Sequence, residues 1–119
     1  MTDRPNVVFL LADQLRADVL SLYGGTNIRT PNIDRLAGEG VTLDRCISTC
    51  PVCTPYRGML MTGRHPQTTG VTVNSTRTRY SEIGLGDVFA RQGYRTGYVG
   101  KWHLHTGAWP GNNVPDWVP

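Results

Sequence analysis

The feature that most constrains the fold is an unbroken apolar run, VVFLLA, at residues 7–12. Its β-branched and large apolar side chains do not alternate with polar ones, so both faces of the segment must be covered. Strands of this kind are typical of parallel sheets with helices on either side. The run is much shorter than the roughly 20 apolar residues that cross a bilayer. It therefore predicts a buried strand in an α/β domain.

Helix and strand patterns alternate after this run. A weak helical pattern occurs over residues 15–23, and a clearer one runs from the Thr30-Pro31 cap to the stop at Gly38 and Gly40. Two more occur over residues 55–61, ended by Gly63, and around residues 85–89 before Gly93. Strand patterns occur over residues 41–45 and 94–99. The Thr-, Ser- and Gly-rich stretch 65–82 is predicted to be surface loop. This order predicts an α/β fold with a mixed, largely parallel sheet flanked by helices.

Length and charge restrict the class of protein further. The 119 residues suit one small domain. However, residues 109–119 show no periodicity, and a sheet of only two or three parallel strands would have open edges and uncovered faces. We therefore expect the opening part of a larger α/β domain. The net charge is +3 and the arginines are scattered, which disfavours nucleic-acid and membrane partners but suits a small anionic substrate. Residues 1–6 lack the apolar core of a secretory signal, so a cytoplasmic location is expected. The oligomeric state stays open.

Chemically active residue types concentrate in CTPYRGMLMTG, residues 53–63. A helix that starts near Pro55 places Cys53 at its N-terminus, where free N–H groups and the helix dipole favour a thiolate or an oxyanion. Arg57, one turn on, can return to the same face and bind that anion. The spacing therefore indicates an anion site. Cys50 and Cys53 also form a C-x-x-C pair, which leaves a redox or metal-binding module as an alternative.

Four segments, in the same order, resemble the type I sulfatases, formylglycine-dependent enzymes of the alkaline-phosphatase-like superfamily. The segments are PNVVFLLAD at 5–13, TPNIDRLA at 30–37, the stretch that begins at Cys53, and GYVGKWHL at 97–104. The similarity runs from about residue 5 to residue 107. It implies that residues 1–119 are the N-terminal part of a sulfatase catalytic domain with an alkaline-phosphatase-like fold.

The resemblance implies catalytic roles for four residues. A maturation enzyme would oxidise Cys53 to formylglycine, and one oxygen of the hydrated aldehyde would attack the sulfur of a sulfate monoester. The alcohol would leave, and the second hydroxyl would then expel sulfate and restore the aldehyde. Arg57 and Lys101 would hold the hydrate and neutralise charge, while His103 would contact the ester. Tyr56 stands where the family usually has serine.

The resemblance also implies a divalent cation. Asp13, Gln14 and the hydroxyl of the converted residue 53 would bind it, and these oxygen donors suit Ca²⁺, with Mg²⁺ or Mn²⁺ as alternatives, better than Zn²⁺. Asp13 and Lys101 each follow a predicted strand, where open α/β sheets bind ligands. An extended backbone would also point Lys101, His103 and His105 to one side. The later metal ligands of the family have no counterpart here, so the 119-residue piece alone is expected to be inactive.

Several alternatives stay open. The Asp13-Gln14 pair resembles choline sulfatases and the related phosphonate and phosphate-ester hydrolases, so the alternative activity is that of a phosphonate monoester or phosphodiester hydrolase. A non-catalytic truncated homologue would keep an unmodified thiol at position 53. Taken singly, Asp13 could cap a helix, Lys101 could be a surface amine and His103 a core histidine.

Overall fold

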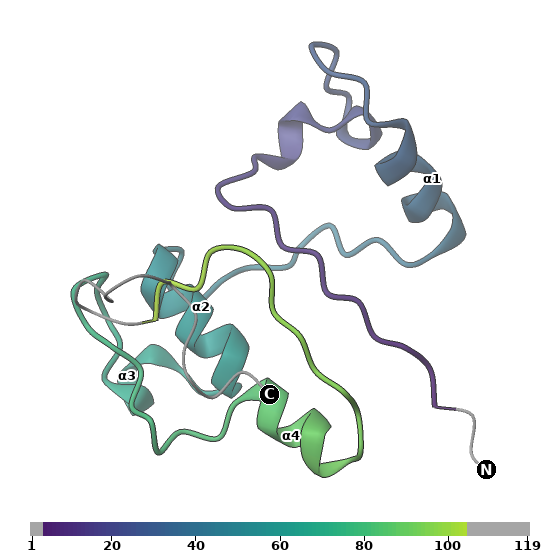
Figure 1. Ribbon diagram of the computed structural model, residues 1–119. Helices are drawn as coiled ribbons and strands as arrows, with labels where there is room; N and C mark the ends of the chain where they lie inside the picture. The colour runs from purple at the N-terminus through teal and green to yellow at the C-terminus, as the bar shows by residue number, and fades with distance from the viewer. Residues whose placement is uncertain (1–3, 105–119) are drawn as a thin grey trace. The chain divides into compact units, whose positions relative to one another are not determined.

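The computed structural model describes residues 4–104, and the chain divides into a first unit, Met1–Cys46, and a second unit, Ile47–Pro119. Every regular element within the described residues is helical, and none is a strand (Figure 1). Among these residues no helix is long and apolar enough to cross a membrane.

The first unit contains helix α1, Pro31–Glu39, and two 3-10 turns, Ala17–Val19 and Ser21–Tyr23. The predicted start of α1 is confirmed, with Thr30 as the N-cap residue and Pro31 in the first turn. Thr30 and Ser21 bond reciprocally: each backbone N–H donates to the other's hydroxyl oxygen, at 2.8 and 3.0 Å. The helix predicted weakly over residues 15–23 is wrong as a continuous element, because Leu20 is extended (ψ 138°) and separates the two turns.

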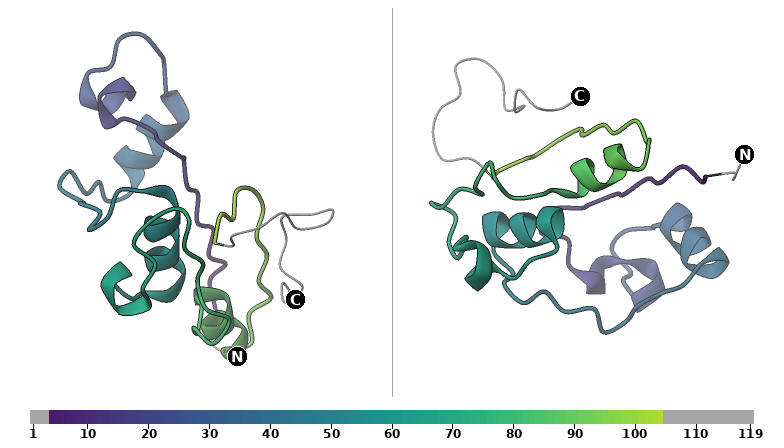
Figure 2. Two further views of the ribbon diagram at one scale, coloured as in Figure 1. Left: turned by 90° about the vertical axis from the view of Figure 1, so that its left-hand side faces the viewer. Right: turned by 90° about the horizontal axis from the view of Figure 1, so that it is seen from below.

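The second unit contains three helices: α2, Cys53–Thr62; α3, Pro66–Thr69; and α4, Leu85–Arg91. Helix α2 begins at Cys53 rather than near Pro55, and it ends as predicted at Gly63. Gly63 is left-handed (φ 66°) and donates its N–H to the Met59 carbonyl oxygen at 2.8 Å, which is a common way to end a helix. Both α3 and α4 contact α2, and Figure 2 shows them beside it in two further views.

The core of the second unit lies under α2. Val71 is 1% exposed, and the helix residues Pro55 and Gly58 are buried as well. The Val71 side chain lies close enough to Gly58 that a methyl group added there would be in contact with it. The prediction that residues 65–82 are surface loop is therefore wrong for part of that stretch. Pro66 opens a short helix there, and the chain after it returns to cover α2.

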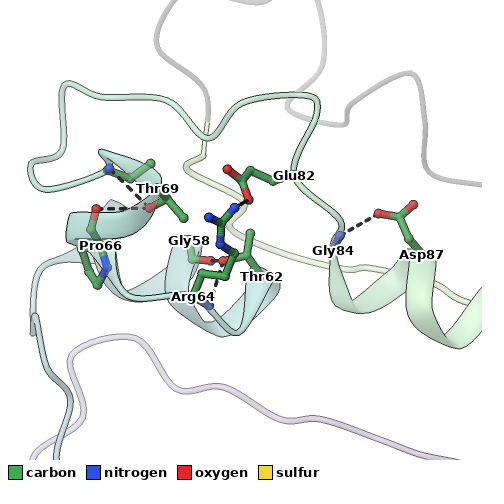
Figure 3. A network of polar contacts seen from close by, with 9 residues as sticks. Gly58, Thr62, Arg64, Pro66, Thr69, Glu82, Gly84 and Asp87 are labelled. Atoms are coloured by element: carbon green, nitrogen blue, oxygen red, sulfur yellow. Dashed lines mark hydrogen bonds and ion pairs between the residues drawn. The ribbon is translucent and has the colours of Figure 1, made fainter.

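Polar contacts tie the end of α2 to the approach to α4 (Figure 3). The Thr62 hydroxyl donates to the Gly58 carbonyl oxygen at 2.7 Å, one turn back in the helix. Arg64 pairs with Glu82 at 2.5 Å, and the Glu82 side chain is only 8% exposed. At the start of α4, the Gly84 N–H donates to the Asp87 carboxylate at 2.7 Å. These contacts position the C-terminal half of α2 and leave its N-terminal turn to other partners.

The three predicted strands are not formed among the described residues, so the predicted sheet is not confirmed. The segments concerned have no regular structure, residues 44 and 45 lie in a turn, and many of the apolar side chains are exposed. Val8 is 79% exposed and Leu10 85%, and Val41 and Val99 are also exposed. A fully apolar strand needs neighbouring strands on both sides, and the described residues form none.

Candidate functional site

The predicted site residues are divided between the two units. Asp13 and Gln14 belong to the first unit, and Cys53, Arg57, Lys101 and His103 belong to the second. Within the second unit the structure brings the Arg57 side chain to the backbone of Lys101. It thereby links α2 to the segment that carries both Lys101 and His103. His105 lies outside the described residues.

Cys53 is the first residue of α2, as the anion-site prediction requires. Four backbone N–H groups at a helix start usually lack a helical partner. Here the Val52 N–H bonds the Cys50 carbonyl oxygen at 2.9 Å, Pro55 has no N–H, and the Thr54 N–H is bound by a side chain. Of these four positions at the start of α2, only Cys53 has an N–H without an acceptor among residues 4–104. The anion site predicted from several free N–H groups therefore reduces to one backbone donor.

The side chain that binds the Thr54 N–H is Asn74, a residue that the sequence did not single out. Its Oδ1 atom accepts the hydrogen bond at 2.9 Å, and the Thr54 hydroxyl approaches the Asn74 carbonyl oxygen at 3.5 Å. Thr54 is 1% exposed whereas Asn74 is exposed, so these contacts are partly buried. The N-cap residue, Val52, provides no side-chain cap. Asn74 thus caps α2 from twenty residues along the chain.

Arg57 is the buried cation of the site, with 5% of its surface exposed. Its Nη1 atom donates to the Lys101 carbonyl oxygen at 2.5 Å and to the Tyr98 hydroxyl oxygen at 3.3 Å. The Tyr98 hydroxyl donates in turn to the same Lys101 carbonyl oxygen. The Tyr98 ring also packs edge-on against Trp102, with centroids 5.0 Å apart. The guanidinium is therefore fixed by a backbone acceptor and by a tyrosine that motif reading passed over.

Lys101 and His103 are both exposed, and they lie on either side of Trp102. The next residue, Leu104, is 4% exposed, and its carbonyl oxygen accepts the Thr78 N–H at 3.1 Å. His103 is left-handed, with φ 54°. The prediction that strand alternation points Lys101 and His103 to one side is therefore unsupported, because the backbone is not extended at residue 103.

Gln14, like His103, is a non-glycine residue with a positive φ, here 58°. Residues other than glycine, asparagine and aspartate seldom adopt this backbone conformation, and those that do are concentrated at functional sites. Both cases in residues 4–104, Gln14 and His103, are residues that the family resemblance assigns to the site. The described residues contain no group of three or more His, Cys, Asp or Glu side chains that could hold a metal ion.

The three cysteines are free thiols. Cys46 is exposed, whereas Cys50 and Cys53 are partly buried. In the described part of the chain Cys50 and Cys53 belong to no metal-binding cluster, although they stand in a C-x-x-C spacing.

Comparisons with known proteins identify relatives of the chain. A family model described as Sulfatase matches residues 5–111. An ulvan-active sulfatase of Formosa agariphila is 43% identical over 101 residues, covering 85% of this chain and 20% of that protein. Human steryl-sulfatase is 40% identical over 112 residues, covering 85% of this chain and 19% of that protein. The chain thus spans about a fifth of the length of these curated relatives.

A solved structure agrees with these relatives. The crystal structure of yidJ from Bacteroides fragilis, a protein assigned as a sulfatase, matches 89% of this chain and 24% of that chain. The match has a TM-score of 0.81 and 39% sequence identity. Because the family model covers most of the sequence and the structural match covers the same part, this chain belongs to the sulfatase family.

Proposed function

We propose that the complete protein is a sulfuric ester hydrolase that releases sulfate from a sulfate monoester, and that residues 1–119 are the N-terminal part of its catalytic domain. Membership of the sulfatase family supports the proposed activity. The chain spans about a fifth of the length of its relatives, which supports the proposal that it is one part of a catalytic domain. The observation that carries the proposal lies in the second unit. Cys53 opens α2, and one turn on, the buried Arg57 is bound to the Lys101 backbone.

Each of these residues has a proposed task. Cys53, converted to formylglycine by a maturation enzyme, would supply a hydrated aldehyde as the nucleophile toward sulfur. Arg57 keeps a positive charge within one turn of residue 53, in a buried position where that charge acts strongly. Lys101 and His103 are exposed and would meet the sulfate ester from solution. Positive groups fixed before substrate binds stabilise the negative charge that develops on the transferred group.

Asp13 and Gln14 suit a divalent cation by their chemistry, since carboxylate and amide oxygens are hard donors. We favour Ca²⁺, with Mg²⁺ and Mn²⁺ as the alternatives. Calcium takes about six to eight oxygen ligands, so most of the ligands would come from residue 53 and from the rest of the complete protein. The bound cation would draw charge from the group being transferred.

The sheet of the alkaline-phosphatase-like fold is also proposed for the complete protein. Its first strands would be the apolar segments around residues 7–12, 41–45 and 94–99. Their exposed side chains support this assignment, because residues such as Val8 and Leu10 are otherwise left in water. In that sheet, the chain after residues 12 and 99 would reach the edge where α/β proteins bind ligands.

Mass spectrometry of the peptide around residue 53 and steady-state kinetics of the complete protein test the proposed function. We expect an aldehyde in place of the thiol, and a higher kcat/KM for an aryl sulfate than for the matched aryl phosphonate. A preference for the phosphonate would favour the alternative hydrolase suggested by Asp13-Gln14. An unmodified thiol with no turnover would favour the non-catalytic homologue, and zinc held by Cys50 and Cys53 would favour the metal-binding module.

A further inference from the structure

The cap on α2 comes from outside the helix and carries no charge. Ordinarily a Ser, Thr, Asp or Asn at the N-cap position binds the free N–H groups of the first turn. Val52 cannot do so, and Asn74 supplies the missing acceptor to the Thr54 N–H at 2.9 Å. The cap therefore fixes the residue that directly follows Cys53.

We propose that Asn74 is a positioning residue for the chemistry at residue 53. Its amide oxygen holds the first turn of α2 through Thr54 and thereby orients the nucleophile. Because the amide is neutral, it leaves the positive end of the helix dipole to the anionic ester. This inference rests on the proposed function, because it assumes that residue 53 is the nucleophile and that a sulfate ester binds at the start of α2.

The neutral charge of the Asn74 side chain is the part of the proposal that can be tested most sharply. An aspartate at position 74 keeps the acceptor atom, and its charge interacts favourably with a helix N-terminus, so the fold should tolerate it. The same carboxylate repels a sulfate group bound beside Cys53. A purely structural cap would accept this substitution without loss, whereas a positioning cap next to an anion site would not.

The first experiment compares Asn74→Asp, Asn74→Ala and wild type in the complete protein. We expect Asn74→Asp to melt within about 2 °C of wild type, while KM for an aryl sulfate and the inhibition constant of inorganic sulfate both rise about tenfold. Asn74→Ala should melt lower and lose kcat about tenfold, because the nucleophile is less well oriented. Asn32→Asp, which changes the net charge equally on α1, should leave all of these values unchanged. Wild-type KM and inhibition constant in Asn74→Asp would overturn the proposal.

The second experiment does not depend on turnover. Protein made without the maturation enzyme keeps the Cys53 thiol, and its alkylation can be followed peptide by peptide. Asn74→Asp should slow alkylation of Cys53 several-fold relative to Asn32→Asp, because the added carboxylate disfavours the thiolate. Amide hydrogen exchange at Thr54 should quicken at least tenfold in Asn74→Ala, with exchange in α4 unchanged.

The two experiments separate the two hypotheses. If wild type hydrolyses no sulfate ester but the alkylation and exchange effects appear, the proposed function fails while the cap and its electrostatic role stand. If turnover is normal and Asn74→Asp changes neither sulfate binding nor alkylation, the sulfatase stands and the role of Asn74 is refuted.

Discussion

At the scale of single residues, Arg57 is the most constrained group of the candidate site. Its guanidinium is buried, and the same nitrogen donates to the Lys101 carbonyl oxygen and to the Tyr98 hydroxyl. Lysine keeps the charge but places it on one flexible point and cannot reproduce the planar donor set. We therefore expect Arg57→Lys to lower kcat/KM for an aryl sulfate by about 10²-fold, the usual cost of losing one fixed stabilising donor.

The matched control for this substitution is Arg35→Lys in α1. Arg35 forms an exposed pair with Glu39 at 3.2 Å, and such pairs contribute little. Steady-state kinetics on both variants, with melting temperatures to show that they are folded, give the comparison. Equal activity of the two variants would mean that Arg57 acts only as a packed side chain.

Some of these residues were predictable from the sequence and others were not, for a physical reason. Cys53 and Arg57 share one short helix, so their spacing alone predicts that they lie one turn apart. Asn74 and Tyr98 act across gaps of twenty and forty-one residues, and no local pattern records such contacts. A polar residue in a loop that later covers a helix start is indistinguishable in sequence from any other loop residue.

At the scale of elements, the tie between α2 and the approach to α4 depends on a half-buried ion pair. Arg64 is 49% exposed and Glu82 8%, and they lie 2.5 Å apart. Removing the Glu82 charge leaves the guanidinium without its anion. We expect Glu82→Gln to lower the free energy of unfolding by about 2 kcal/mol, between the values for exposed and buried pairs.

Urea denaturation of the complete protein, followed by circular dichroism, measures this effect. Glu39→Gln is the matched control, because the Arg35–Glu39 pair is exposed on both sides and should contribute at most about 0.5 kcal/mol. A loss for Glu82→Gln no greater than that of the control would show that the pair does not hold the two elements together.

Two glycines of the first unit should respond in opposite ways to alanine. A Cβ atom on Gly25 would overlap the Val19 carbonyl oxygen, which is backbone and cannot move aside cheaply. A Cβ on Gly38, inside α1, meets nothing within 4 Å. We expect Gly25→Ala to lower the melting temperature and Gly38→Ala to raise stability by about 0.5–1 kcal/mol, since alanine is the better helix former. Thermal melts of the two variants, side by side, decide the matter, and a stable Gly25→Ala protein would contradict the close packing of Gly25.

Elements with their own start and stop signals were predictable. Thr30-Pro31 opens α1, Gly63 ends α2, and the short helix before Gly93 is present as α4. The stretch 65–82 was not predictable, because Val71 is buried by α2, a partner earlier in the chain, and not by any periodicity of its own. Local chemistry thus accounts for helix ends, while burial depends on the tertiary partner.

At the scale of the whole molecule, the exposed apolar segments are the ones that the proposed sheet of the complete protein would bury. Strands of a parallel sheet pair with segments distant in sequence, and residues 4–104 offer no such pairing to residues 7–12 or 94–99. The apolar pattern therefore predicts burial that these residues alone do not provide. A chain that spans about a fifth of its relatives leaves room for the remaining strands.

Amide hydrogen exchange compares the isolated chain with the complete protein and tests whether these segments become strands. Backbone N–H groups of residues 7–11 and 94–99 should exchange rapidly in the isolated chain and at least a hundredfold more slowly in the complete protein, because ladder hydrogen bonds protect them there. Amides within α2 bond inside the helix in either case, so they serve as the internal reference wherever the helix is formed. Rapid exchange of both segments in a complete protein whose α2 is protected would mean that they stay outside the sheet. The apolar run after Asn6 would then need a different partner, such as a second copy of the chain.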